Sequence, residues 1–133
     1  MKVLLFHANQ DEIGYIKACN EKFRFDLAFA DFDFNGAGPD SFTGFDAVWI
    51  TTNCKVTKEK AEILKKAGVP YIVSRAAGID HLDLAAMKDN NIKGANVPRY
   101  SPGAIAEHTV CLVLMCLRKM KRDSLWSVSL ILL

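Results

Sequence analysis

Short apolar runs alternate with helical segments along most of this chain, and that alternation limits the possible folds more than any other feature. The run at Val3–Phe6 contains no polar residue, which is typical of a strand buried on both faces. Strands of this kind, separated by helices, predict a parallel sheet with helices on both faces and right-handed crossovers. We therefore expect an α/β fold.

Turn and capping residues indicate where the elements begin and end. The helix at 58–67 is the best marked, because Thr57 can cap it, Gly68 follows its end and Pro70 prevents its continuation. Strands are expected at 3–6, 25–30, 45–50, 69–74 and 93–97, and further helices at 9–21, 82–90 and 101–121. This order favours a flavodoxin-like, doubly wound parallel sheet of about five strands.

Length and charge exclude several classes of protein. The chain has 133 residues, enough for one ordinary domain. Its 17 Lys and Arg residues and 15 Asp and Glu residues are interspersed and leave a net charge of +2, so we expect neither nucleic acid nor a membrane as a partner. The N-terminal apolar stretch is too short for a signal peptide. The four cysteines include no C-x-x-C pair, which favours reduced thiols in a cytoplasmic protein.

The helix expected at 101–121 is apolar on every side. Ser101 and Pro102 provide a typical start, and the stretch 109–117 has no charged residue. A helix on a single sheet hides only one stripe of its surface. Large exposed apolar patches are uncommon on monomers, so we expect this helix to be covered by a second domain or by another subunit.

A turn of small residues at 75–80 follows one of the predicted strands, and ligands of open parallel sheets bind beyond the carboxyl ends of the strands. The small side chains of Ala76, Ala77 and Gly78 would let a ligand approach the backbone, whose N–H groups form a site for a carboxylate. The alternative is a tight connection that needs Gly78 for its backbone angles. Tyr100 follows the last strand, and its hydroxyl could reach the same edge; the alternative there is a half-buried amphipathic ring.

Other motifs for chemistry are missing from the sequence. His7, His81 and His108 do not have the spacing of metal ligands, so no metal site is predicted. The stretch Gly36–Ser41 begins like a nucleotide-binding G-x-G-x-x-G loop but contains a proline and ends in serine. There is also no P-loop and no G-x-S-x-G motif. We therefore assign no catalytic, cofactor-binding or metal-binding residue to this chain.

Two segments resemble the N-terminal part of the NAD-dependent D-2-hydroxyacid dehydrogenases, and in particular the D-lactate dehydrogenase branch of that family. They are the stretch Ser74–Leu84 and the stretch Asn96–Thr109, which contains Val-Pro-x-Tyr-Ser-Pro followed by Ala-x-Ala-Glu-His. The second is the more specific of the two. Together with Thr51-Thr52-Asn53 and the order of elements, the resemblance extends over about residues 1–122.

The resemblance implies an enzyme of two lobes, in which a flavodoxin-like substrate domain closes on a Rossmann domain. Hydride passes between the nicotinamide of NAD and C2 of a small 2-oxo or 2-hydroxy acid. By the same resemblance, the backbone at Ala76, Ala77 and Gly78 would hold the substrate carboxylate, and Tyr100 would line the substrate pocket. The helix at 101–121 would lie at the lobe junction and dimer interface.

The chain departs from the family in what it lacks. The family's substrate-binding arginine, acid, proton-donating histidine and G-x-G-x-x-G loop lie downstream in the second lobe, and none of them is present here. Arg75 falls in a different motif and is expected to be local structure. We expect a substrate domain at 1–100, the interface helix at 101–122 and an atypical apolar tail at 123–133, with the Rossmann lobe absent. A truncated or frame-shifted product, or a fragment of a longer chain, would explain such a tail.

The sequence leaves two hypotheses of function open. In the first, the chain is a partial D-lactate dehydrogenase-like oxidoreductase whose parent interconverts a 2-oxo acid and a D-2-hydroxy acid with NAD(H), while the chain alone neither binds NAD nor turns over. Its partners would be the acid and either the missing Rossmann lobe or a second copy. In the second, it is a non-catalytic module that associates through the apolar helix at 101–121.

Overall fold

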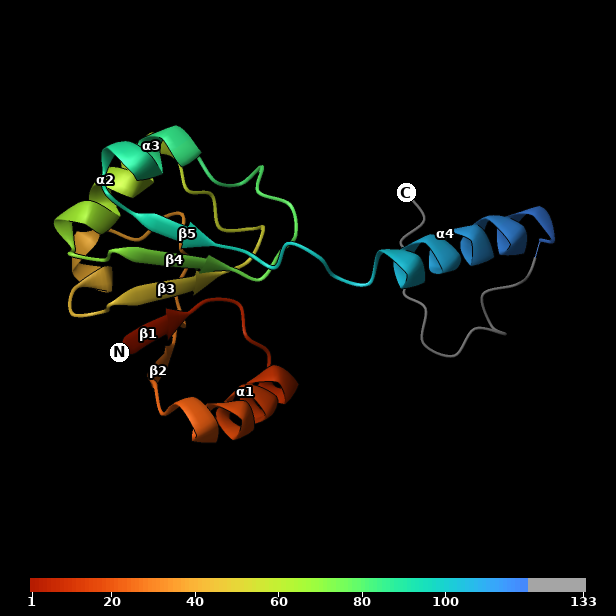
Figure 1. Ribbon diagram of the computed structural model, residues 1–133, viewed down its shortest axis with the longest axis horizontal. Coiled ribbons are helices and arrows are strands. Elements are labelled where there is room, and N and C mark those ends of the chain that lie inside the picture. Colours follow the sequence, from red (N-terminus) through yellow and green to blue (C-terminus); the bar gives the residue numbers. More distant parts are fainter. Residues whose placement is uncertain (120–133) are drawn as a thin grey trace. The chain divides into compact units, whose positions relative to one another are not determined.

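The computed structural model describes residues 1–119 of the chain. The apolar tail expected at 123–133 lies outside the described residues. The chain divides into two compact units, one from Met1 to Pro98 and the other beginning at Arg99. The whole sheet belongs to the first unit (Figure 1).

The first unit is built on a five-stranded sheet in which all neighbouring strands are parallel. The strands in chain order are β1 (Lys2–Leu5), β2 (Asp26–Phe29), β3 (Ala47–Ile50), β4 (Tyr71–Ser74) and β5 (Lys93–Ala95). Their order across the sheet is β2-β1-β3-β4-β5, which is the flavodoxin-like order. The predicted α/β fold with a doubly wound parallel sheet is confirmed.

Helices lie on both faces of this sheet (Figure 1). Right-handed crossovers place α1 (Gln10–Phe23) on one face, and α2 (Lys58–Lys66) and α3 (Leu84–Asp89) on the other. Each helix begins at a capping side chain that accepts a hydrogen bond from the first helical turn, and these caps are Asn9, Thr57 and Asp83, respectively. The helix boundaries therefore follow local capping chemistry that is visible in the sequence.

The main core lies between the sheet and the helices α2 and α3. At its centre the rings of Phe6, Phe34 and Phe42 pack edge to face or tilted, with centroids 5.2 to 6.1 Å apart. Phe42 comes from a short 3-10 helix, η1 (Pro39–Phe42). The ammonium of Lys60, from α2, lies over the Phe34 and Phe42 rings and donates to a backbone carbonyl of the preceding loop at 2.7 Å. These contacts fix the connection between β2 and β3 against α2.

The opposite face of the sheet is covered more thinly. No residue of α1 is fully buried. In β4, Ile72 faces the main core, whereas Tyr71 and Val73 face the α1 side and are exposed. Within residues 1–119, the buried cluster on this side is small and consists of Val3, Leu5 and Ala47. Parallel sheets are normally covered on both faces, so within the described residues this face is left open at β4.

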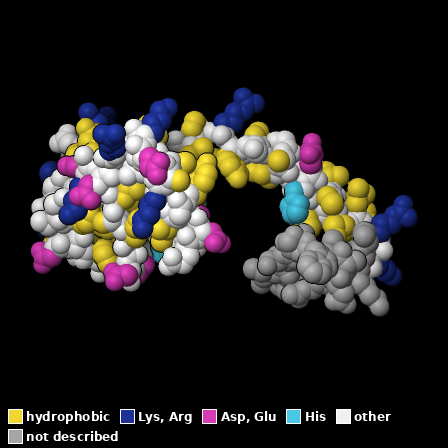
Figure 2. All heavy atoms as spheres, turned by 90° about the horizontal axis from the view of Figure 1, so that it is seen from below, with side chains coloured by type: hydrophobic (Ala, Val, Ile, Leu, Met, Phe, Trp, Pro, Cys, Tyr) yellow, Lys and Arg dark blue, Asp and Glu magenta, His cyan; other side chains and the backbone are white. Residues whose placement is uncertain are grey.

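The second unit contains α4 (Pro102–Leu117), with Pro102 in the first turn as expected. None of its residues is buried, and Figure 2 shows hydrophobic side chains along it. The expected helix end at 121 is wrong. The helix ends at Leu117 because Lys119 adopts a left-handed backbone conformation, with φ 51°, and the amides of Arg118 and Lys119 bond back to the last turn. Among residues 1–119, no helix has the length and hydropathy that a membrane span requires.

Candidate functional site

The loop 75–80 leaves β4 at the edge of the sheet where the parallel strands have their carboxyl ends. The amide of Arg75 donates to the carbonyl of Ile50, the last residue of β3, at 2.9 Å, which continues the ladder one residue past β4. The strand order reverses between β1 and β3. Doubly wound sheets bind their ligands at this edge, so the loop is in the position where a site is expected.

The loop presents three consecutive backbone amides that have no acceptor in the described part of the chain, residues 1–119. The carbonyl of Ala76 accepts from the amide of Val97 at 3.2 Å, and that of Ala77 accepts from Nδ2 of Asn96 at 2.9 Å. By contrast, the N–H groups of Ala76, Ala77 and Gly78 donate to no atom of residues 1–119. Ala77 and Gly78 are also exposed. Such a row of free donors can bind a small anion such as a carboxylate.

Gly78 is not required by the backbone of this loop. Its φ lies outside the left-handed region, unlike that of Gly44 and Gly68. A Cβ built on Gly78 would meet only Oδ2 of Asp80, at an ordinary contact distance of 3.6 Å. The alternative that the turn needs this glycine for its backbone angles is therefore wrong. The missing side chain instead keeps the backbone accessible.

A buried pair of side chains closes the base of the loop. Oγ of Ser74 and Nε2 of His81 lie 2.9 Å apart, and the two residues expose 0% and 5% of their surface. Burial lowers the pKa of His81, the charge of Lys55 lowers it further, and Asp80 acts in the opposite direction. The imidazole is therefore neutral near pH 7. Nothing in the sequence predicted this contact, because a serine and a histidine at that separation form no recognisable pattern.

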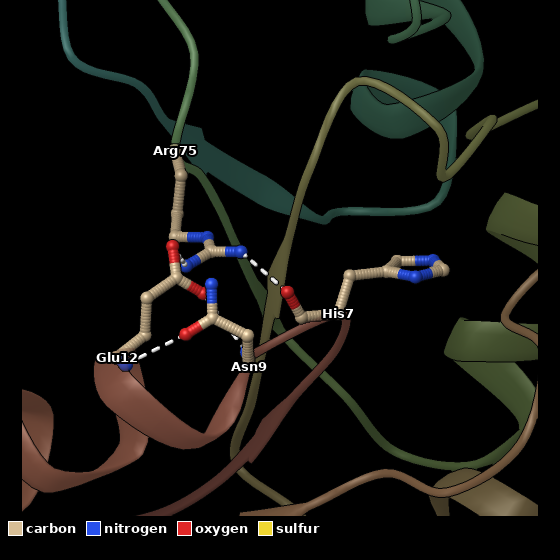
Figure 3. A network of polar contacts seen from close by, with 4 residues as sticks. All are labelled: His7, Asn9, Glu12 and Arg75. Carbon is tan, nitrogen blue, oxygen red and sulfur yellow. Dashed lines mark hydrogen bonds and ion pairs between the residues drawn. The ribbon is translucent and has the colours of Figure 1, made fainter. Parts of the chain in front are cut away.

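Arg75 is engaged by the N-terminal end of α1 (Figure 3). Its Nη2 donates to the carbonyl of His7 at 2.9 Å, and its Nη1 lies 3.2 Å from Oε1 of Glu12. The amide of Asn9, and next the Arg75 side chain, lower the pKa of Glu12, so this carboxylate stays charged. The His7 ring points away from the network (Figure 3). Arg75 thus joins the end of β4 to α1, which agrees with its expected role as local structure.

The free amides lie on an open edge of the first unit. A hollow of about 510 Å³ lies between α3 and β5, and Ile79 and Asn96 line part of it. Neither Ala77 nor Gly78 lines this hollow. A carboxylate bound to the amides would therefore stay in contact with water unless another part of the protein covers it.

The structure brings Ala76, Ala77 and Gly78 together in one loop but places Tyr100 in the second unit. The Tyr100 side chain is 71% exposed there. The half-buried position that the sequence also allowed is not observed. A role of the Tyr100 hydroxyl at the substrate stays a prediction.

Comparisons with known proteins identify relatives along nearly the whole chain. The profile of the D-isomer specific 2-hydroxyacid dehydrogenases, catalytic domain, matches residues 3–128. The D-lactate dehydrogenase of Escherichia coli (strain K12) is 35% identical over 122 residues, which cover 92% of this chain and 37% of that protein. The apo-structure of D-lactate dehydrogenase from Escherichia coli matches with a TM-score of 0.77 and 33% identity, over 98% of this chain and 43% of that one.

A further solved relative is a D-isomer specific 2-hydroxyacid dehydrogenase from Lactobacillus delbrueckii ssp. bulgaricus in its NAD complexed form. It matches with a TM-score of 0.69 and 27% identity, over 98% of this chain and 43% of that one. The chain spans about two fifths of the length of these relatives. Because the profile match covers nearly all of the sequence, the chain belongs to the D-isomer specific 2-hydroxyacid dehydrogenase family, in the part that corresponds to its catalytic domain.

Proposed function

We propose that this chain is the substrate-binding part of an NAD-dependent D-2-hydroxyacid dehydrogenase of the D-lactate type, and that its loop 75–80 binds the carboxylate of a small 2-oxo acid. The observation that carries the proposal is the row of free amides at Ala76, Ala77 and Gly78 at the carboxyl edge of the sheet. The match to a D-lactate dehydrogenase supports the substrate class. We place the protein in the cytoplasm, in keeping with its four free cysteines.

Backbone amides suit this task because they are neutral, rigid donors that do not titrate. Three donors on consecutive residues can engage both oxygens of a carboxylate and hold one end of the substrate. The uncharged amide or ester of the same acid forms weaker hydrogen bonds with these backbone donors than the carboxylate does. The loop would therefore select 2-oxo acids over their neutral derivatives and leave C2 free for the reaction.

NAD does not fit the turn between the first strand and the first helix of this chain. Dinucleotide sites hold the pyrophosphate at a glycine-rich turn between the first strand and the first helix. Here that turn is His7-Ala8-Asn9, which contains no glycine. Two amides at the start of the helix are engaged by its capping box: the amide of Glu12 donates to Oδ1 of Asn9, and the amide of Asn9 donates to Oε2 of Glu12. The Glu12 carboxylate would also repel a phosphate. We infer that NAD binds to residues of the whole enzyme that are not in this chain.

The open edge of the loop also favours an enzyme of two lobes. Ala77 and Gly78 are exposed, whereas reduction of a bound 2-oxo acid needs a site from which water is excluded. A second lobe that closes over the loop would provide that cover. The chain by itself should therefore bind the acid weakly and show no turnover with NADH and pyruvate; rates at the level of an enzyme would contradict this.

Titration of the ¹⁵N-labelled chain with oxamate, a stable analogue of pyruvate, tests the carboxylate site. We expect saturable shifts of the backbone amide resonances of Ala76, Ala77 and Gly78, with little change in β2 at the far edge of the sheet. Pyruvamide, in which a neutral amide replaces the carboxylate, is the control and should cause no such shifts. Equal shifts with both compounds, or oxamate shifts elsewhere only, would contradict the proposal.

A second function, association through α4, is favoured by a separate observation. From Thr109 to Leu117 the helix carries no charged residue, yet none of its residues is buried within residues 1–119, and Val113 and Leu114 expose 53% and 54% of their surface. A second copy or a further domain would remove this surface from water. Light scattering of the purified chain should therefore show an oligomer, and a monomer at all concentrations would count against this function.

A further inference from the structure

We propose that Ser74 and His81 form a positioning pair, which sets the conformation of the loop 75–80 and thereby the affinity of its amides for a carboxylate. This inference rests on the proposed function of the loop and adds the residues that hold it in place. Neither side chain would touch the substrate, since both are buried beneath the loop.

The pair joins the two ends of the loop. Ser74 is the last residue of β4 and His81 follows the loop, so the 2.9 Å contact between Oγ and Nε2 closes the turn. The backbone of His81 is fixed independently, because its carbonyl accepts from the amide of Val56 at 2.8 Å. The amide of Asp83 in turn donates to the carbonyl of Val56 at 2.9 Å. With both backbones anchored, their hydrogen bond adds a direct side-chain tie between the two ends of the loop.

Other interactions hold the loop only in part. The side chains at 76–78 are two methyl groups and a hydrogen, which bury little apolar surface. The first half of the loop is tied by the bonds from Asn96 and Val97 to its carbonyls. The half beyond Gly78 is exposed and has one backbone bond, from the amide of Leu82 to the carbonyl of Ile79. The placement of the Gly78 amide therefore depends on the Ser74–His81 pair.

A serine and a histidine at this distance can also act as a nucleophile and its base, but burial excludes that chemistry here. Ser74 exposes 0% of its surface, so no substrate reaches its hydroxyl. No carboxylate among residues 1–119 hydrogen-bonds to the imidazole to orient it as a base. A buried polar pair with its hydrogen bond satisfied is instead the kind of contact that specifies one conformation of the surrounding chain.

Three variants test the pair in the ¹⁵N-labelled chain. Ser74→Ala and His81→Leu each remove the hydrogen bond, whereas His81→Gln keeps a polar nitrogen near the position of Nε2. We expect the first two to weaken oxamate binding about fivefold, as for the loss of one hydrogen bond, and the double variant to be no weaker than either. His81→Gln should stay within about twofold of the parent chain.

The readouts separate positioning from a general effect on stability. The amide shifts and ¹⁵N relaxation of Ala77 and Gly78 report on the loop, and those of Val48 and Ile72 confirm that the core is folded. The proposal is overturned if Ser74→Ala and His81→Leu melt earlier but keep the oxamate affinity and loop relaxation of the parent chain. If the parent chain binds no oxamate while those two variants loosen the loop and His81→Gln does not, the carboxylate function fails and the positioning of the loop stands.

Discussion

Replacing Gly78 with alanine should stabilise the fold and weaken substrate binding at the same time. Gly78 has no left-handed φ, and a Cβ there would meet only Oδ2 of Asp80 at 3.6 Å, so the folded chain accepts the methyl group without strain. The unfolded chain loses backbone freedom. At such positions the change adds about 0.4 to 1 kcal/mol to the free energy of unfolding, or about 1 to 6 °C in melting temperature for a domain of this size.

Binding should change in the opposite direction, because the new methyl group would stand where a carboxylate approaches the amides of Ala77 and Gly78. We expect the oxamate affinity of Gly78→Ala to fall about tenfold, which corresponds to about 1.4 kcal/mol. Thermal unfolding followed by circular dichroism gives the first quantity, and titration followed by amide resonances gives the second.

Two other glycines provide matched controls. Gly14 lies inside α1 with nothing within 4 Å of a built Cβ, so Gly14→Ala should add about 1 kcal/mol of stability and leave binding unchanged. Gly68 has φ 78°, so Gly68→Ala should destabilise the fold by about 1 kcal/mol. A Gly78→Ala variant that is destabilised as much as Gly68→Ala would refute the structural reasoning. One that is stabilised but binds oxamate like the parent chain would refute the site.

Further predictions concern the core, the buried histidine and the exposed helix. Leu64 is fully buried, so Leu64→Ala should lower the free energy of unfolding by about 2 to 5 kcal/mol in urea denaturation; a loss below about 1 kcal/mol would contradict its place in the core. Burial lowers the pKa of His81 in the folded chain. As the pH falls through about 6.5, the unfolded chain therefore binds more protons than the folded chain does. The free energy of unfolding should then decrease from about pH 7 to pH 5, and an equal slope in His81→Gln would contradict this. Leu114→Glu should reduce the mass seen by light scattering, with Glu107→Gln as the control; an unchanged oligomer would exclude association through this face of α4.

Much of the fold could be predicted because its signals are local. Thr57 and Gly68 bracket α2 in the sequence, and both occupy the expected positions in the structure, as cap and as a left-handed residue. The end of α4 was not predictable in this way. The apolar pattern continues up to Leu117 and is followed by Arg118 and Lys119. The helix ends where Lys119 adopts a left-handed conformation that no glycine marks.

The candidate site was predicted in its location but not in its construction. A turn of small residues after a parallel strand indicated the loop, and the resemblance to the family indicated a carboxylate. Only the structure shows that Asn96 and Val97 donate to carbonyls of the loop. It also shows that three amides of the loop, those of Ala76, Ala77 and Gly78, have no acceptor within residues 1–119. That the backbone does not require a glycine at position 78 was likewise visible only from its observed φ and surroundings.

The order of strands and helices along the chain could be predicted from the sequence alone, because hydrophobic period and capping act over a few residues. The handedness of crossovers then favoured the flavodoxin-like strand order, which the structure confirms. The tertiary structure decided which polar groups meet. Arg75 reaches His7, 68 residues away, and His81 closes on Ser74 in the core. Contacts of this kind depend on the directions in which distant segments present their side chains after packing, and no spacing along the chain records those directions.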